Sequence, residues 1–274
     1  DTIGDTYSMI YADEATDKVG CYYFSDEYAK AVQRAKKWYD EGLIYKDAAT
    51  SQDFDATLIK NNVVFSIVCA GELGMQQAKS VATGYDLLIK KVADSMISTQ
   101  MMYKFGFGVP VTSTDPEAAV KFLDLLYSDS DIENTLAWGV KGRDWIENGN
   151  GEAAFPEGVT AETATYHMAD FLNGNQFITL PWEGQGADFR NIQREVQKTA
   201  PISKYMGFSF DLSTVSSEQT ACFNVGEQYR ASLASGSVNN FDKTYNEFKE
   251  KLTAAGIDKV INAYQEQLDA WLKK

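Results

Sequence analysis

The sequence predicts an α/β protein, because segments with helical periodicity are interspersed with short runs of β-branched and aromatic residues. Its 274 residues, of which 44% are hydrophobic and 23% charged, have the balance of a globular protein. This length is enough for one large domain or for two lobes. No repeat of fixed period and no low-complexity linker divides the chain further.

The first two predicted helices have clear start and stop signals. Apolar residues recur at three-and-four spacing from Asp26 to Glu41, between an N-cap at Ser25 and a stop at Gly42. A second helix is expected over 116–127, with Thr114 or Asp115 as its N-cap and a proline at its first position. Between them, the region around 78–80 predicts a short helix.

Three further helices are predicted at the end of the chain. Their apolar residues again recur at three-and-four spacing, and Gly256 ends the second of them. The expected ranges are Ser217–Ala234, Phe241–Ala255 and Asp258–Leu272.

Four segments predict strands. The N-terminal run 7–11 is strand-like, and the runs Val63–Cys69 and Tyr85–Val92 have the β-branched composition of buried strands. In Met101–Val111, aromatic and apolar residues alternate with Lys104 and two glycines before a proline. Glycines on one face would let a backbone or a ligand approach closely.

The stretch from 137 to 188 has little periodicity and is rich in glycine and aromatic residues. Long irregular stretches in compact proteins tend to carry binding surfaces. We therefore expect the ligand side of the protein here.

The charge balance narrows the classes of partner. The chain has 39 acidic and 25 basic residues, for a net charge of -14, which repels nucleic acid and anionic membrane surfaces. No stretch approaches the roughly 20 apolar residues of a membrane helix. The chain opens at Asp1 without Met and runs almost at once into a strand-like segment, so we expect a mature product or an excised fragment of a longer protein.

Cysteine and histidine usage argues against metal and nucleophile chemistry. Cys21, Cys69 and Cys222 are too few and too scattered for a disulfide framework and are expected to be structural thiols. His167 is the only histidine, which excludes histidine-based zinc sites and leaves no second imidazole for a relay. We expect it to be structural, since no Gly-x-Ser-x-Gly elbow of a nucleophilic serine accompanies it. No phosphate-binding loop opens a helix in the sequence either. We expect no metal and no cofactor.

The segment 129–133 resembles the start of a calcium loop, but Asn134 stands at the sixth loop position and Val140 at the twelfth. Val140 cannot ligate a cation, so calcium is rejected and a solvated helix end is expected.

Carboxylates near glycines and aromatic residues leave one enzymatic alternative open. A carbohydrate-active hydrolase would need two carboxyl groups roughly 5–10 Å apart in a cleft. The candidates are Glu72, Asp170, Glu183 and Asp188, and nothing in the sequence fixes a pair. A surface scaffold without a small ligand is the third class.

Three tryptophans, Trp138, Trp145 and Trp182, are flanked by glycine, proline or charged residues rather than by core residues. An aromatic ring beside a carboxylate or an amide suits a polyhydroxylated ligand, whose C–H face stacks while its hydroxyls are hydrogen-bonded. Each could instead anchor a loop to the core. Trp182 is the strongest candidate, because Pro181 and Gly184 force a turn that presents its indole. Glu183 and Glu72 are candidate hydroxyl acceptors, and Trp145 and Tyr103 complete the expected ligand-binding set.

Several blocks, in order along the chain, resemble the later part of the extracellular solute-binding lipoproteins of carbohydrate ABC importers, as found in Gram-positive bacteria. The matching segments are 35–48 (AKKWYDEGLIYKDA), 138–145 (WGVKGRDW), 207–211 (GFSFD), 254–260 (AAGIDKV) and 265–271 (QEQLDAW). The resemblance extends over nearly the whole chain.

The resemblance implies a periplasmic-binding-protein-like fold, with helices covering a mixed sheet, and a non-enzymatic protein that delivers an oligosaccharide to an ABC permease. Such proteins are two-lobed and longer, so the chain is expected to be a C-terminal portion. Residues 1–98 and 204–274 would form the second lobe, and 99–203 the hinge-crossing strand, a first-lobe helix and the irregular ligand-side segment. The resemblance also implies a monomer tethered to the outer face of the cytoplasmic membrane by an N-terminal lipid, and it places Glu72 at a ligand-facing strand end.

Overall fold

The computed structural model describes residues 1–4, 9–53, 55–71, 73–94, 96–102, 106–160, 163–172 and 174–274. The chain folds into two compact units. Unit 1 comprises residues 1–66, 98–100 and 202–274, and unit 2 comprises 67–97 and 101–201.

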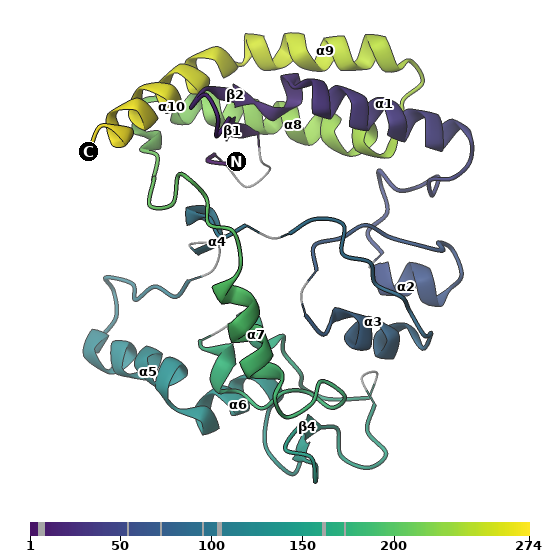
Figure 1. Cartoon of the computed structure of the whole chain (residues 1–274), viewed down its shortest axis with the longest axis vertical. Coiled ribbons are helices and arrows are strands. Elements are labelled where there is room, and N and C mark those ends of the chain that lie inside the picture. The colour runs from purple at the N-terminus through teal and green to yellow at the C-terminus, as the bar shows by residue number, and fades with distance from the viewer. Residues whose placement is uncertain are drawn as a thin grey trace. The chain divides into compact units, whose positions relative to one another are not determined.

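Helices are the main regular structure among the described residues of both units (Figure 1). The α-helices are α1 (Asp26–Asp40), α2 (Asp55–Lys60), α3 (Met75–Thr83), α4 (Thr99–Met102), α5 (Pro116–Ser128), α6 (Ser130–Trp138), α7 (Phe189–Lys198), α8 (Ser216–Ser235), α9 (Phe241–Ala254) and α10 (Ile257–Leu272). Short 3₁₀ helices are η1 (Tyr22–Phe24), η2 (Asp170–Leu172), η3 (Gln176–Ile178) and η4 (Leu212–Thr214).

Two antiparallel two-stranded sheets occur in the described ranges. Strand β1 (Ile10–Ala12) pairs with β2 (Val19–Cys21), with Ile10 opposite Cys21. Strand β3 (Ile146–Glu147) pairs with β4 (Ala153–Ala154), with Ile146 opposite Ala154.

The predicted helix boundaries are confirmed by their caps. The Ser25 hydroxyl accepts a hydrogen bond from the Tyr28 amide at 3.1 Å at the start of α1. Asp115 caps α5 by accepting from the Ala118 amide at 3.0 Å. Each side-chain cap satisfies one of the backbone donors that a helix start leaves unpaired.

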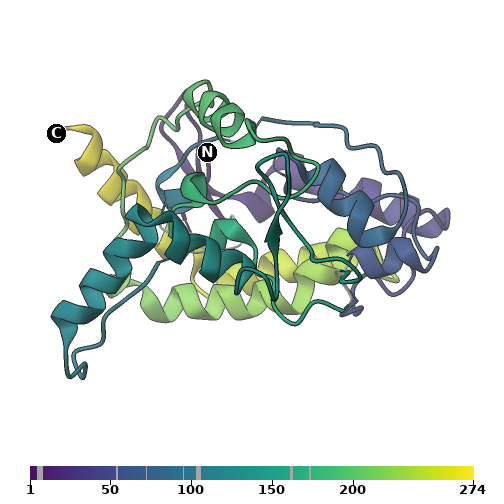
Figure 2. The same cartoon turned by 90° about the horizontal axis from the view of Figure 1, so that it is seen from below.

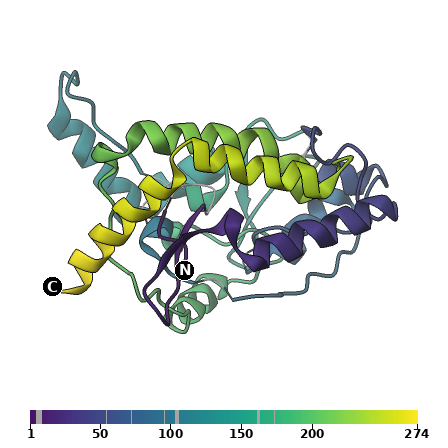
Figure 3. The same cartoon turned by 90° about the horizontal axis from the view of Figure 1, so that it is seen from above.

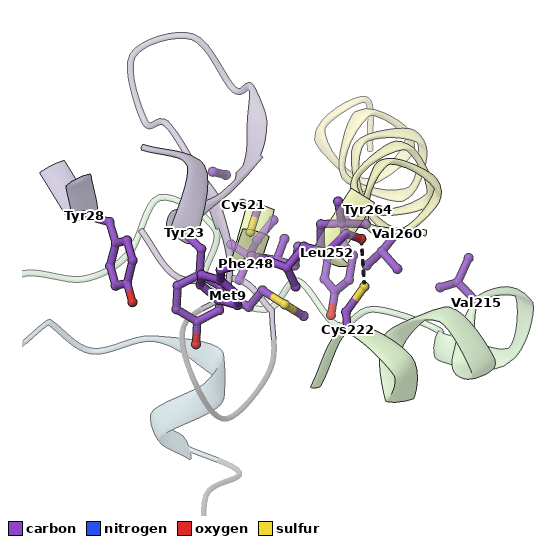
Figure 4. Packing of buried hydrophobic residues seen from close by; sticks show 14 of the residues in the cluster. Met9, Cys21, Tyr23, Tyr28, Val215, Cys222, Phe248, Leu252, Val260 and Tyr264 are labelled. Atoms are coloured by element: carbon purple, nitrogen blue, oxygen red, sulfur yellow. Dashed lines mark hydrogen bonds between the residues drawn. The ribbon is translucent and has the colours of Figure 1, made fainter. Parts of the chain in front are cut away.

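Unit 1 is built around a core that α1, α8, α9 and α10 share with the N-terminal hairpin (Figure 3). Phe248 and Leu252 of α9 and Leu268 of α10 are fully buried there. The ring of Phe248 lies 5.0 Å from that of Tyr23 and stacks on that of Tyr229 at 5.3 Å, measured between ring centroids. Figure 4 shows Phe248 and Leu252 among their neighbours.

The buried thiols of Cys21 and Cys222 belong to this core, as expected of structural cysteines, whereas Cys69 of unit 2 is exposed. The Cys222 Sγ lies 3.9 Å from the Leu252 carbonyl oxygen (Figure 4).

The N-terminal hairpin is tied to the last helix by one side chain. The Gln265 amide of α10 accepts from the Val19 backbone N–H at 2.8 Å and donates to the Asp17 carbonyl at 2.9 Å. These bonds hold the open edge of β2 against α10, although the partners are almost 250 residues apart in the chain.

Unit 2 contains α3, α5, α6 and α7 and long stretches without regular structure, among which lies the β3–β4 hairpin (Figure 2). Its buried cluster consists of Ala137, Trp138, Trp145 and Ala153, with Leu180 and Trp182 packed against it. The expected irregular region therefore contributes the small core of this unit.

The strands predicted at 63–69 and 85–92 are wrong. Neither range is a strand, and Phe65, Val68 and Leu88 are 100%, 96% and 91% exposed. The amides of Val63 and Val64 donate back to the Leu58 carbonyl instead. A β-branched run forms a strand only when another backbone pairs with it, and neither run has such a partner in the part of the chain that the structure describes.

The strand predicted at 101–111 is also absent from its described residues. Met101 and Met102 end α4, and 106–111 have no regular structure. Tyr103, Lys104 and Phe105 lie outside the described residues.

The helix end expected at 129–133 is the start of a complete helix. Asp129 caps α6, accepting from the amides of Asp131 and Ile132. The prediction that this end is solvated is wrong for Glu133, which is 1% exposed because it faces inward from α6.

Candidate functional site

Three rings surround Trp182 in unit 2. Its ring centroid lies 4.5 Å from that of His167, 4.8 Å from that of Phe155 and 5.0 Å from that of Trp138. His167 and Phe155 meet the indole edge to face, the geometry that aromatic pairs favour. Trp138 is buried at the end of α6, Trp182 is half-buried and His167 is exposed, so the cluster extends from the core to the surface.

The backbone on both sides of Trp182 is fixed to β4. The Ala153 amide donates to the Pro181 carbonyl at 2.8 Å, and the Glu183 amide donates to the Ala153 carbonyl at 2.7 Å. The Trp182 amide donates to the Gln185 side-chain oxygen at 2.8 Å. Trp182 is therefore held on a short bridge to a strand, and the prediction that a turn presents its indole matches this geometry.

Glu152 holds the far side of the same turn. One carboxylate oxygen accepts from the amides of Gly184 at 3.1 Å and Gly186 at 2.7 Å, and the other accepts from the Asn148 side-chain amide at 3.0 Å. These hydrogen bonds favour the ionised carboxylate and hold the pKa of Glu152 below its usual value. The bond from Asn148 has the largest effect.

The predicted ligand-binding residues lie in different settings. Glu183 is exposed on the turn beside Trp182, and its carbonyl accepts from the Gln77 side-chain amide at 2.7 Å. Trp145 is 5% exposed and belongs to the buried cluster, where its indole N–H donates to the Gly139 carbonyl at 2.9 Å. Glu72 and Tyr103 lie outside the described residues.

Asp144 orders the loop around Trp145. Its buried carboxylate accepts from the Arg143 guanidinium, the Val140 amide at 2.8 Å and the Thr165 hydroxyl at 2.8 Å. These bonds, led by that from Arg143, lower the pKa of Asp144 strongly. The Asp144 carboxylate therefore has a structural role, because its oxygens accept hydrogen bonds from the protein.

Two carboxylates that the hydrolase alternative needs have local roles. Asp170 pairs with Arg190, which is buried and also donates to the Thr179 hydroxyl at 2.7 Å. Asp188 is exposed and accepts from the Asn191 side-chain amide at 2.6 Å. Among the residues described, no three His, Cys, Asp or Glu side chains are grouped so as to hold a metal ion.

A groove elsewhere in unit 2 is poorly suited to a polar ligand. A shallow groove of about 370 Å³ lies between α5 and α6, lined by Phe122, Leu126, Asp131, Ile132, Thr135, Leu136 and Tyr166. Only Asp131, Thr135 and Tyr166 bring polar groups to it, and the Tyr166 hydroxyl already donates to the Leu136 carbonyl.

His167 should titrate below the usual range of an imidazole. Its pKa is lowered because the surrounding rings remove water from it, although the charge of Asp170 opposes the shift. Because His167 is the chain's only histidine, its imidazole proton signals in NMR are assigned without mutagenesis. We expect their titration midpoint below 6.5. The unfolded chain takes up this proton first, so protein stability should fall as the pH drops through that window.

The variant His167→Gln serves as the control and should remove these signals. A midpoint at or above 6.5 would show that the charge of Asp170 outweighs the removal of water by the rings.

No helix within the described ranges is both long and apolar enough to cross a membrane.

Comparison of the fold with solved structures gives the class of protein. The chain has the fold of the solute-binding proteins of ABC transporters. It superimposes on the N-glycan transport solute-binding protein NgtS from Streptococcus pneumoniae with a TM-score of 0.78 and a sequence identity of 26%. The superposition covers 97% of this chain and 59% of NgtS. The NgtS complex with Man5GlcNAc gives a TM-score of 0.75 at 26% identity, over 97% and 59% of the two chains. A human-milk-oligosaccharide (HMO) binding solute-binding protein from Bifidobacterium longum infantis shares the fold with a TM-score of 0.55 at 19% identity, over 97% of this chain and 58% of that one.

The sequence comparison points to the same class. A carbohydrate ABC transporter substrate-binding protein from Streptococcus pneumoniae serotype 4 is 28% identical over 263 residues, covering 94% of this chain and 52% of the relative. Residues 204–273 match a domain of unknown function, DUF3502. The resemblance to carbohydrate solute-binding proteins and the expected binding-protein fold are thereby confirmed. The mixed sheet expected within that fold is not found among the described residues, where both sheets are two-stranded and antiparallel. The chain spans about half the length of the curated relative that it matches.

The sequence named Trp138, Trp182 and Glu183 as candidates but did not single out Phe155, His167 or Glu152 as their neighbours. Phe155 and Glu152 carried no signal, because nothing in the sequence showed that β4 pairs with the turn at 181–183.

Proposed function

We propose that this chain is part of a non-enzymatic solute-binding protein that captures an oligosaccharide outside the cell and delivers it to an ABC permease. The observation that carries the proposal is the similarity of nearly the whole chain to NgtS, structures of which contain Man1GlcNAc and Man5GlcNAc. A glycan of mannose and N-acetylglucosamine is accordingly the first ligand to test.

We propose Trp182 as the stacking platform for a sugar ring. Three neighbouring rings fix its indole, which stays partly exposed. The indole can therefore offer an apolar surface to a ligand without further ordering. The exposed carboxylate of Glu183 stands next to it on the turn and would accept hydroxyl hydrogen bonds. Glu72 and Tyr103 remain proposed contacts, and Trp145 is proposed to support the site from its buried position.

We also propose that residues 1–98 and 204–274 belong to the C-terminal lobe, and 99–203 to the hinge-crossing and ligand-side segment. The divisions of the compact units near residues 97 and 201 support this proposal, whereas 67–97 group with unit 2. We propose further that the protein is a monomer, tethered by an N-terminal lipid to the outer face of the cytoplasmic membrane.

Trp182→Ala should weaken glycan binding and leave the fold intact. Loss of a stacking ring should cost about 1–3 kcal/mol of affinity, which is about 5- to 150-fold in Kd. Isothermal titration calorimetry with Man1GlcNAc and Man5GlcNAc measures this on the protein as encoded, including any sequence that flanks this chain.

The matched control is Trp38→Ala, since Trp38 is a tryptophan of α1 in unit 1 that is 45% exposed. It should bind with wild-type affinity. If Trp182→Ala lowers the melting temperature by several degrees but leaves affinity unchanged, Trp182 is a core anchor. Hydrolysis of the bound glycan would overturn transport as the function, and a wild-type protein that binds no glycan would favour a scaffold.

A further inference from the structure

The turn 181–186 is closed by a single buried carboxylate. We propose that Glu152 is a positioning residue, which holds Trp182 and Glu183 in the conformation that receives the sugar. This inference rests on the proposed function and concerns the same site. Glu152 is 4% exposed and does not reach the surface on which a ligand would stack.

The hydrogen bonds of Glu152 fix two points of the turn at once. The same carboxylate oxygen accepts from the amides of Gly184 and Gly186, at 3.1 Å and 2.7 Å. Backbone amides that converge on an anion form a cradle, and hydrogen bonds to an ionised acceptor are roughly twice as strong as neutral ones. The turn therefore folds around the carboxylate.

Both glycines have a backbone that other residues adopt rarely. Gly184 and Gly186 have φ values of +89° and +88°, which aim their amides at Glu152. A Cβ at Gly184 would also lie 2.9 Å from the side-chain nitrogen of Gln77, which donates to the Glu183 carbonyl. The positions on either side of Gln185 are thus shaped for this contact.

Glu152 is itself held rigidly by the β3–β4 hairpin. Its amide donates to the Asn148 side-chain oxygen at 3.1 Å, and its carbonyl accepts from the Asn148 amide at 2.9 Å. The Asn148 side-chain nitrogen donates to its second carboxylate oxygen at 3.0 Å. The position of the carboxylate is therefore set by the hairpin, before any ligand arrives.

Trp182 depends on this arrangement through its own amide. That amide donates to the Gln185 side-chain oxygen, and Gln185 lies between the two clamped glycines. Without Glu152 the turn would lose the hydrogen bonds that hold the amides of Gly184 and Gly186. The turn would then become ordered only when a sugar binds. Ordering a loop on binding lowers affinity even when every contact with the ligand is kept.

The decisive variants are Glu152→Ala, Glu152→Gln and the double variant Glu152→Ala with Trp182→Ala. Calorimetry with Man5GlcNAc should show Glu152→Ala weakened about 5- to 50-fold, which stays within the loss expected for Trp182→Ala. Glu152→Gln keeps an acceptor oxygen of the same reach but loses the charge that strengthens both amide bonds, so its affinity should lie between those of Glu152→Ala and the wild type. In the Trp182→Ala background, Glu152→Ala should weaken binding less than threefold, because Glu152 acts through the tryptophan.

Glu147→Ala is the matched control, since Glu147 is an exposed carboxylate on β3 of the same hairpin. It should bind as the wild type does. The proposal is overturned if Glu152→Ala binds with wild-type affinity, or if it loses as much affinity without Trp182 as with it.

A ligand-free measurement separates this proposal from the proposed function. Amide hydrogen exchange over 182–187 should accelerate at least tenfold in Glu152→Ala and by a smaller factor in Glu152→Gln. If the wild type binds no glycan, the proposed function fails, while exchange still decides whether Glu152 orders the turn. Unchanged exchange in a folded Glu152→Ala overturns the inference, and if that variant does not fold, unchanged exchange in Glu152→Gln does so.

Discussion

Phe248→Ala should lower the free energy of unfolding of unit 1 by about 3–5 kcal/mol, the range for removing a fully buried phenylalanine. The side chain has no solvent exposure and lies between the rings of Tyr23 and Tyr229. Its loss would leave a cavity lined by large aromatic rings, which cannot close around it without moving α8 or η1. Urea denaturation followed by far-ultraviolet circular dichroism measures the change, because the longest helices belong to unit 1.

The control is Asn246→Ala, an exposed position on the same helix, which should change stability by no more than about 0.5 kcal/mol. A loss below about 1 kcal/mol for Phe248→Ala would mean that the core of unit 1 repacks, contrary to the close ring contacts described above.

Glu133→Gln should stabilise unit 2 at neutral and alkaline pH but not in acid. Glu133 is buried on α6, and burial, followed by the charge of Asp170, raises its pKa from 4.5 to about 7. Asp170 itself is paired with Arg190. One oxygen of Glu133 has no hydrogen-bond partner among the described residues, so ionisation is not compensated locally.

The sign follows from proton uptake. From pH 4.5 to 7 the unfolded chain releases the Glu133 proton before the folded chain does, so stability falls as the pH rises through that window. Above pH 7 the loss of stability should level off at about 3 kcal/mol, and the neutral glutamine avoids this loss. Native-state hydrogen exchange of peptides from α6 over pH 4 to 8 measures the difference in stability between the variant and the wild type.

Asp131→Asn replaces an exposed carboxylate of the same helix and should keep the wild-type pH dependence. A variant at Glu133 whose stability runs parallel to the wild type across the whole range would show that the carboxyl group is already ionised at acid pH.

The helices were predictable because their signals are local. The caps at Ser25 and Asp115 and the apolar spacing of the last three helices each act within a few residues, and the structure reproduces them to within two residues. Helix α7 was missed although its sequence carries a helical signal, because Phe189, Ile192 and Val196 recur at the three-and-four spacing of one helix face. The signal is short, with Phe189 and Arg190 as the only buried residues of the helix.

The strands failed for the opposite reason. Pairing of a strand depends on a partner far away in the chain, and the composition of 63–69 or 85–92 says nothing about whether that partner is present. The candidate site shows the same division. Pro181 and Gly184 around Trp182 predicted a turn from local residues. Glu152, which follows Gly-Asn-Gly, has its role only through hydrogen bonds to residues more than 30 positions away in the chain.

The bonds between Gln265 and the hairpin at 17–19 have a consequence for the order of biosynthesis. A ribosome adds about 5–20 residues per second, so β2 emerges more than ten seconds before α10 exists to cover it. Throughout that interval the hairpin has no permanent neighbour from the C-terminal helices, and unit 2 is completed before unit 1. Chaperones that bind extended apolar segments therefore have more time to bind the N-terminal hairpin of this chain than its C-terminal helices.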